Sequence, residues 1–235
     1  MKIKHYTFLV SVTLITAFAS CKLSSSDTPP PATAFYIVHA SPNAPNVDVI
    51  ANGGIYAQNL AYTKDTGYFY VPPALYNLKV ASTGTTNYLI DANLTFQSGK
   101  FYSLFAIDSL SKIKAVVVED VLAVPGTDSA LIRFFQFSPN TPYAYAEFKN
   151  TTDSLKYSTG RTFNDQSTNS SFASFTPIKA GTYELKISPL DGSAVISFPG
   201  LVFANGRNYT IYLRGFKDGA GTQALGVGVI KNLGD

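Results

Sequence analysis

Apolar and polar residues alternate in short runs along most of this chain, and turn-forming residues separate the runs every eight to twelve positions. A period of two is typical of half-buried β-strands, and no window of about a dozen residues has the 3.6-residue period of a helix. Seven or eight such runs in about 90 residues predict an all-β fold of immunoglobulin-like β-sandwich type. In the first half of the chain the runs cover roughly 34–40, 46–51, 55–61, 67–71, 75–82, 88–96, 101–107 and 113–120.

One motif occurs twice, at Phe35–Val49 and at Ile132–Ala146, where a strand leads through Ser-Pro-Asn-x-Pro into another strand. Pro42 and Pro139 fix φ at the second position of a tight turn. The opening motifs lie 97 positions apart (41 and 138), whereas later matching segments lie 107 apart (76 and 183). The second copy therefore carries about ten extra residues around Thr151–Ser171, and their richness in Ser, Thr and Asn predicts a surface loop.

The repeat predicts two tandem domains, with the first sandwich at 35–122 and the second at 129–235. The join, Val121–Ser129, is short, so we expect it to hold the sandwiches end to end and expect cleavage near it to yield two folded halves. Tyr76 and Tyr183 occupy matching places and resemble the tyrosine corner of such sandwiches. Each hydroxyl is expected to bond to the backbone a few residues upstream.

Residues 1–20 have the form of a secretory signal, with a basic start followed by an apolar stretch too short to span a bilayer. The Phe-Ala-Ser-Cys sequence ending at Cys21 resembles a bacterial lipobox, and Cys21 is the only cysteine. Cys21 is therefore the predicted lipidation site. The alternative is an ordinary cleavage site beside an incidental thiol. Residues 21–34 are rich in Ser and Pro and are expected to form an extended tether.

Composition excludes most classes of catalytic and nucleic-acid-binding site. The chain has 18 basic and 15 acidic residues, and Lys2 and Lys4 belong to the leader, so the remainder is near neutral and has no basic run for nucleic acid. Beyond the leader His39 is the single histidine, which excludes histidine-pair metal sites. No calcium loop, phosphate-binding loop or nucleophile elbow is present. We expect neither a metal nor a cofactor.

His39 and Asp48 are the residues that a catalytic interpretation would choose. Gln136 stands at the position of His39 in the second copy, and both side chains offer a donor and an acceptor. We therefore expect His39 to brace the adjacent turn. Asp48 lies between two valines that alternate with it, so it is expected to be a solvated strand residue.

The stretch His39–Val49, with Tyr-x-x-Val-Pro at 68–72 and Ser-Gly-Lys-x-Tyr at 98–102, resembles the domain of unknown function 4397 family. The resemblance is close over 35–120 and looser over 130–232. It implies a bacterial exported protein, often a Bacteroidota lipoprotein and often with tandem copies. The family has no established activity, so the resemblance implies fold and location but no chemistry.

Exposed aromatic residues are the better candidates for a ligand-binding surface, because exposed rings bind sugars and partner proteins. Tyr68 and Tyr70 share one strand face, and Tyr143 and Tyr145 share another. These four are the candidate ligand-facing residues, with a place in the core as the alternative. The absence of Trp makes a carbohydrate platform less favoured.

Three Asp-Ser pairs resemble the O-glycosylation motif of exported Bacteroidota proteins, which makes Ser109, Ser129 and Ser154 candidate modification sites. Ser129 is the preferred one, because a glycan in the join would stiffen it. The alternative is that Asp-Ser marks turns, since both side chains bond to local backbone. An intact mass of the mature protein equal to lipid plus bare polypeptide would exclude the modification.

These observations favour a non-catalytic lipoprotein of the outer membrane that acts as a binding, adhesive or scaffolding module. Its expected partners are the membrane, through the lipid anchor, and an unknown envelope protein or glycan; whether it faces the periplasm or the surface stays open. A carboxylate-based hydrolase of envelope or extracellular polysaccharide is the alternative. It would need Asp48 with Asp91 or Glu119 in one pocket, about 5–10 Å apart. A purely structural envelope component is a third interpretation.

Overall fold

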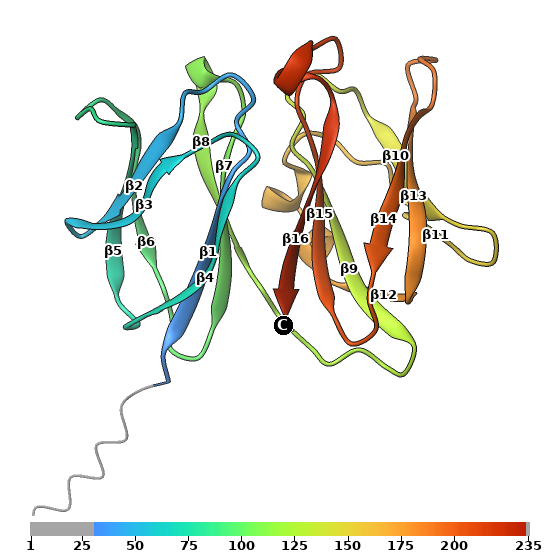
Figure 1. Ribbon diagram of the computed structural model, residues 1–235, viewed down its shortest axis with the longest axis horizontal. Helices are drawn as coiled ribbons and strands as arrows, with labels where there is room; N and C mark the ends of the chain where they lie inside the picture. The colour runs from blue at the N-terminus through green and yellow to red at the C-terminus, as the bar shows by residue number, and fades with distance from the viewer. Residues whose placement is uncertain (1–30, 234–235) are drawn as a thin grey trace, which may run out of the picture.

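The computed structural model describes residues 31–233, which form two β-sandwiches lying side by side (Figure 1). The predicted signal segment 1–20 and the predicted lipidation site Cys21 lie outside the described residues, as does most of the predicted tether 21–34. The first strand starts at Thr33 and buries Thr33 and Ala34, so the tether prediction extends two residues too far.

The first sandwich contains eight strands and one short 3₁₀-helix, η1 (Leu110–Lys112). All eight runs of alternating residues form strands, because each places one apolar face toward the core. The strands are β1 (Thr33–His39), β2 (Val47–Ala51), β3 (Gly54–Leu60), β4 (Asp65–Val71), β5 (Leu75–Ser82), β6 (Tyr88–Thr95), β7 (Phe101–Ile107) and β8 (Lys114–Glu119).

The second sandwich repeats this order of eight strands and adds three short 3₁₀-helices, η2 (Asp165–Ser167), η3 (Ser170–Ala173) and η4 (Gly221–Gln223). The strands are β9 (Ser129–Gln136), β10 (Ala144–Lys149), β11 (Ser154–Lys156), β12 (Thr176–Lys179), β13 (Gly181–Pro189), β14 (Ile196–Phe203), β15 (Asn208–Arg214) and β16 (Gly226–Leu233).

Each sandwich consists of two four-stranded sheets with the same strand order in both copies. The sheets β4-β1-β7-β8 and β12-β9-β15-β16 face each other, and we call them the inner sheets; β3-β2-β5-β6 and β11-β10-β13-β14 are the outer sheets. Within each inner sheet the first and seventh strands of the copy run parallel, and the other pairs are antiparallel. The predicted fold class, two tandem immunoglobulin-like β-sandwiches, is confirmed.

Alternating side chains fill the core of each sandwich. In β5, Tyr76, Leu78 and Val80 are buried between the sheets, and Tyr183 and Leu185 do the same in β13. The Tyr76 hydroxyl donates to the Pro72 carbonyl oxygen (2.9 Å), and the Tyr183 hydroxyl donates to the corresponding oxygen four residues upstream (3.1 Å). Both tyrosines therefore close the predicted corner.

The repeated Ser-Pro-Asn motif docks its turn onto the loop after the seventh strand. Asn43 Oδ1 accepts from the Leu110 main-chain N–H (2.7 Å), and Asn140 Oδ1 accepts from the Lys217 N–H (2.7 Å), which lies 107 positions after Leu110. Ser41 Oγ also donates to the Asp108 carbonyl oxygen (2.6 Å). The motif recurs because each copy uses it for the same contact.

The short join predicted that the sandwiches lie end to end, and this prediction is wrong. Their inner sheets pack against each other, so that the four sheets form consecutive layers across the molecule (Figure 1). The linker passes from the end of β8 to the start of β9, which lie at the same end of the molecule, and a short connection is therefore sufficient. Apolar side chains on the outward faces of both inner sheets decide the arrangement.

Candidate functional site

The inner sheets bury a hydrophobic cluster where the two sandwiches meet. Near its centre the ring of Phe105 contacts those of Phe137 and Tyr212, with centroids 5.0 and 5.8 Å away. Strand β1 is consequently buried along its whole length, because one face points into its own sandwich and the other into the interface. The cluster comprises Tyr36, Val38, Ala40, Phe105, Ile107, Val116, Val118, Phe135, Phe137, Tyr212 and Ile230.

A buried ion pair lies within this interface. Arg133 of β9 donates to the carboxylate of Asp120, which follows β8, and both side chains are inaccessible to solvent. The Arg133 guanidinium also donates to Thr210 Oγ1 (2.7 Å) and to the Glu119 carbonyl oxygen (3.3 Å), and it lies 4.5 Å from the ring centroid of Phe175. A buried charge is tolerated only when it is paired and hydrogen-bonded, and here both partners are.

Neutral hydrogen bonds extend the ion pair across the interface. Ser103 Oγ (2.8 Å) and the Tyr68 hydroxyl both donate to Asp120. From the second sandwich, Asn232 Nδ2 donates to the Tyr68 hydroxyl (3.0 Å) and to Ser103 Oγ (3.3 Å). Thr210, which lies 107 positions after Ser103, donates to Asn232 (2.6 Å) as Ser103 does to Asp120. Matching positions of the two copies therefore share one polar network.

The extra residues of the second copy, predicted to be a surface loop at Thr151–Ser171, lie largely at the surface but are folded: they include strand β11 of an outer sheet, and η2 and η3 form a wall beside this interface. Arg161 is fully buried and makes two hydrogen bonds to the Asp165 carboxylate, 2.8 Å from Nε and 2.7 Å from Nη2. It also donates to the Phe134 carbonyl oxygen (2.7 Å) and lies 4.5 Å from the ring centroid of Phe172. This arginine fixes η2 and η3 against β9.

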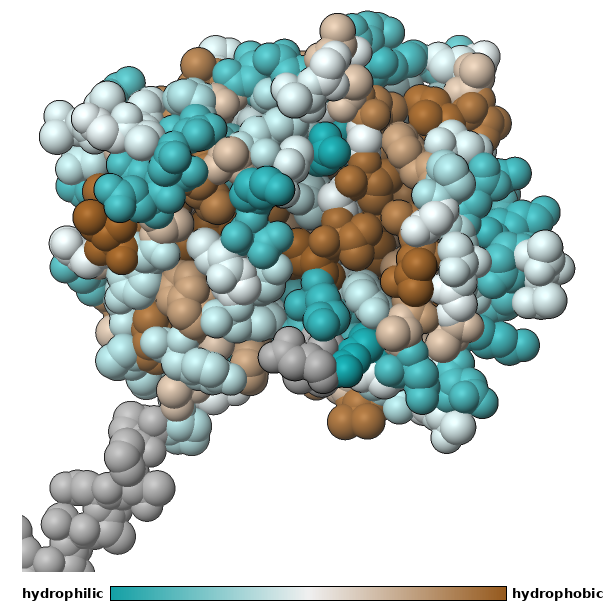
Figure 2. Space-filling model, viewed as in Figure 1, coloured by the Kyte–Doolittle hydropathy of each residue, from teal (hydrophilic) through white to brown (hydrophobic). Residues whose placement is uncertain are grey.

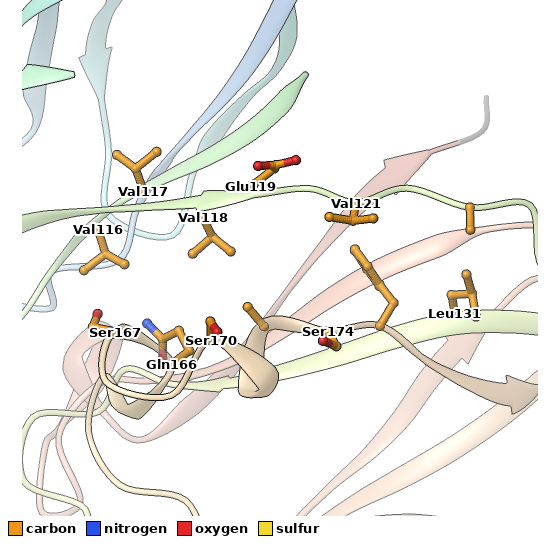
Figure 3. Close-up of a pocket in the computed structure, with 13 residues that line it drawn as sticks. Val116, Val117, Val118, Glu119, Val121, Leu131, Gln166, Ser167, Ser170 and Ser174 are labelled. Carbon is orange, nitrogen blue, oxygen red and sulfur yellow. The ribbon is translucent and has the colours of Figure 1, made fainter. Parts of the chain in front are cut away.

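A cleft of about 670 Å³ separates this wall from β8. Val116 and Val118 point across it toward η2 and η3, whereas Val117 and Glu119 point the other way (Figure 3). The cleft follows β8, which is the edge strand of its sheet, so one side of the β8 backbone borders the cleft. It is lined by Val116, Val117, Val118, Glu119, Val121, Ala123, Leu131, Gln166, Ser167, Ser170, Ala173, Ser174 and Phe175.

His39 braces its turn as expected. Its Nε2 lies 2.9 Å from the Pro45 carbonyl oxygen, and Nδ1 accepts from the Ser41 N–H (3.4 Å). Gln136 makes the corresponding pair of contacts, with Nε2 donating to the Thr141 carbonyl oxygen (3.2 Å) and Oε1 accepting from a main-chain N–H. Because Nδ1 accepts, Nε2 carries the proton and the imidazole is neutral. Burial lowers the pKa of His39 below 6.5, although the Pro45 carbonyl opposes the shift.

A His39→Gln variant is expected to fold and to lose part of the protein's acid sensitivity. The lowered pKa means that neutral His39 stabilises the fold fully above pH 6.5, and that this stabilisation falls as the pH drops below 6.5. Glutamine keeps both hydrogen bonds and does not titrate. Denaturant midpoints at pH about 7.5 and about 5.5 measure the difference. An equal acid-induced loss in wild type and variant would contradict this role.

Asp48 is more than a solvated strand residue. Its carboxylate accepts from the main-chain N–H groups of Asn59 (2.8 Å) and Gly84 (3.0 Å) and from the Thr83 hydroxyl (3.1 Å), which ties β2 to β3 and to the turn after β5. These bonds, the one from Asn59 first, lower the pKa of Asp48. The prediction of a purely solvated role was therefore incomplete, because the side chain lies outside the core yet organises its surroundings.

The carboxylates proposed for a hydrolase are not brought into one pocket. Asp48 and Asp91 lie on strands of an outer sheet, where Asp91 accepts from Asn77 (2.8 Å). Glu119 lines the cleft and pairs with Lys100 (2.8 Å). It is the one carboxylate among the 13 residues that line the cleft. A pair of carboxylates on either side of a scissile bond is thus missing from the cleft.

The four predicted ligand-facing tyrosines have separate environments. Tyr68 is half-buried in the interface, where burial and Asp120 raise its pKa, so this candidate is unavailable to a ligand. Tyr70 is exposed. Tyr143 and Tyr145 lie together with ring centroids 6.1 Å apart, but at 67° to each other, so they do not offer a flat platform.

The three candidate glycosylation serines also differ in environment. Ser109 precedes η1 and is half-buried beside the Asp108 carboxylate. Ser129 is the first residue of β9, where its hydroxyl donates to the Thr127 carbonyl oxygen (3.2 Å). Ser154 is exposed and donates to Glu147 (2.7 Å). The exposure of Ser154 makes it more accessible to a glycan than the preferred Ser129.

Within residues 31–233, no three His, Cys, Asp or Glu side chains gather in a way that could hold a metal ion. In the same part of the chain, none of the helices has the length and hydropathy needed to cross a membrane.

Sequence reasoning missed the residues that join the sandwiches and build the cleft, namely Asp120, Arg133, Arg161 and Asp165. The pattern of the sequence could have revealed Arg133, because this residue interrupts the otherwise apolar run at 130–135. A cation in such a run needs a buried partner. Nothing in the sequence pattern marks Arg161 as a buried residue, because it lies in a polar stretch.

Comparison with known proteins gives one family match. No curated protein matches the chain. A proposed cell adhesion protein of Parabacteroides distasonis is 8% identical, with 85% of this chain and 98% of that chain covered and a TM-score of 0.22. A leucine-rich repeat protein of Bacteroides thetaiotaomicron is 14% identical, with 76% and 26% covered and a TM-score of 0.16. Both TM-scores are too low to support an argument. The model of the family described as "Domain of unknown function (DUF4397)" matches residues 33–144, so the first sandwich and strand β9 carry the match to this family.

Proposed function

We propose that this protein is a non-catalytic binding module of the cell envelope, held at the outer membrane by a lipid on Cys21, and that it binds a partner in the cleft between its sandwiches. The observation that carries the proposal is the cleft itself: a channel of about 670 Å³ along an edge strand, lined by valine and other apolar side chains on one side and partly by serines on the other, with one carboxylate among its lining residues. Such a lining suits binding better than hydrolysis.

The free edge of β8 favours an extended peptide segment as the ligand. The Asp120 N–H donates to Phe101 on β7 (2.8 Å). Because backbone groups alternate along an antiparallel strand, those of Val117 point away from β7, along the open edge of the sheet that borders the cleft. A peptide that adds to this edge gains main-chain hydrogen bonds, and its side chains meet Val118 and Ala173. An envelope protein with an extended segment therefore fits the cleft better than a glycan does.

A photo-crosslinking residue at Ser174 tests the cleft in the native host. Ser174 lines the cleft, whereas Ser197 on β14 is exposed on an outer sheet and serves as the control. Adducts formed from Ser174 but not from Ser197 would support the proposal. They should disappear when Val117→Pro removes an N–H from the open edge of β8, since proline is tolerated on an edge strand. Equal adducts from both positions would contradict a ligand site in the cleft.

The anchor is tested separately. Cys21→Ser is expected to release the protein into the soluble fraction or to leave it unprocessed, because the acyl chains attach through this thiol. Fractionation of wild type and variant from the native host, with the mass of the N-terminal peptide, makes the comparison. A wild-type protein that is recovered soluble, with an unmodified Cys21 thiol, would remove the anchor.

A further inference from the structure

The most exposed hydrophobic side chains lie toward one end of the molecule. We call it the tether end, because β1 begins there at Thr33. Strand β4 finishes there, since Val71 pairs with Thr33, and Leu75 follows directly. Strand β8 also finishes there, because the Asp120 N–H bonds to Phe101 at the start of β7. The linker then crosses this end to reach β9 (Figure 1).

The exposed fractions of the large hydrophobic side chains differ between this end and the opposite one. The large hydrophobic side chains that are exposed by 60% or more lie at the tether end or in the hairpin that contacts Leu75 through Asn52. They are Ile55 (64%), Tyr70 (68%), Leu75 (60%), Val121 (71%), Val124 (87%) and Val202 (62%). Val202 lies at the tether end because it pairs with Thr182 at the start of β13. This strand follows directly after Lys179, which pairs with Ser129 at the start of β9. The opposite end carries Tyr88 (43%), Leu110 (38%), Tyr143 (38%), Leu190 (57%) and Val195 (56%).

The linker contributes the two most exposed of these side chains, Val121 and Val124. Figure 2 shows hydrophobic atoms at the lower edge of the molecule, where the linker passes beneath the sandwiches. Exposed Lys179 lies at the same end, because it pairs with Ser129 at the start of β9. Apolar tips beside an exposed cation match the boundary of a bilayer, where acyl chains meet phosphate groups.

We propose that the tether end is a lipid-contacting surface, with Val124 and Leu75 inserted shallowly into the bilayer interface while the strands stand away from it. This inference rests on the proposed lipid anchor at Cys21. Twelve positions separate Cys21 from Thr33. A Pro-rich segment of that length reaches about 37 Å when extended. The segment joins the fold at the tether end, and the strands place the opposite end roughly 25 Å further from this attachment point.

A tryptophan placed at each end tests the orientation. The chain has no Trp and a single Cys, so the protein from Cys21 onward can be coupled through its thiol to a maleimide lipid in phosphatidylcholine vesicles. Val124→Trp and Leu75→Trp are expected to show a blue-shifted emission and quenching by brominated lipids. The matched control is Val195→Trp at the opposite end, which is expected to keep the emission of a water-exposed indole and to escape quenching.

The coupling is chemical, so the result does not depend on whether the native host lipidates Cys21. Cys21→Ser fractionation tests the anchor, and the coupled vesicles test the surface. Unquenched, red emission from both Val124→Trp and Leu75→Trp would overturn the proposal, as would equal quenching of Val195→Trp. Circular dichroism of each variant establishes that the fold is retained.

Discussion

Replacing Asp120 by alanine is expected to lower the free energy of unfolding by about 3–5 kcal/mol. The substitution leaves the Arg133 guanidinium buried without its carboxylate, and the donors on Ser103 and Tyr68 lose their acceptor. This loss is a large part of the total stability of an ordinary domain, which is about 5–15 kcal/mol. Urea unfolding of the purified protein, with the midpoint and slope both measured, gives the value.

Two controls separate the buried charge from other effects. The double variant Asp120→Leu, Arg133→Met removes both charges and is expected to recover most of the stability, because apolar residues of similar size commonly replace a buried pair. Lys100→Ala breaks the exposed pair with Glu119 and is expected to change nothing measurable. If Asp120→Ala unfolds at the wild-type midpoint, the ion pair does not hold the interface.

Replacing Asp165 by alanine is expected to cost about 3–5 kcal/mol for the same reason, but its effect should be concentrated in the wall of the cleft. Arg161 loses the carboxylate that accepts from its Nε and Nη2, and it stays buried against Phe134. We expect the segment around η2 and η3 to lose its packing on β9 first. Amide hydrogen exchange read by mass spectrometry locates the loss.

The matched control is Asp191→Ala, which removes an exposed carboxylate paired with Lys217 and is expected to leave the midpoint unchanged. The same measurement links stability to the proposed function. Asp165→Ala should abolish the adducts formed from Ser174, while Asp191→Ala should not. Protected η2 and η3 amides in Asp165→Ala would show that the wall does not depend on Arg161.

The strands could be predicted from the sequence because each has one polar and one apolar side. β5 shows this well, since Tyr76, Leu78 and Val80 enter the core while Asn77 and Lys79 stay outside it. The tyrosine corners and the role of His39 could also be predicted, because comparison of the two copies shows which chemistry each position needs. Repetition allowed one half to be interpreted with the help of the other.

The packing of the sandwiches could not be derived from a period of two. β1 and β9 carry near-continuous apolar runs, and such runs are typical of strands buried on both faces. The sequence does not state what covers the second face, and here the other copy covers it. The pattern therefore predicts Tyr68 as a ligand-facing residue: Tyr68 does lie on an outward face of its sheet, but that face is the interface with the second sandwich.

The cleft depends on contacts far apart in the sequence. Its walls come from β8, the linker and residues 166–175, and no motif connects them. The wall exists because Arg161 makes it a folded segment, although its composition resembles that of an exposed loop.

Cutting the linker tests most directly whether the two sandwiches form one body. A protease site introduced at Gly126, which is exposed and has open space around it, allows the purified protein to be cleaved between the halves. The interface predicts that the nicked halves elute together in size-exclusion chromatography and unfold in a single transition whose midpoint rises with protein concentration. Two halves that separate as monomers and unfold in independent transitions would contradict the account.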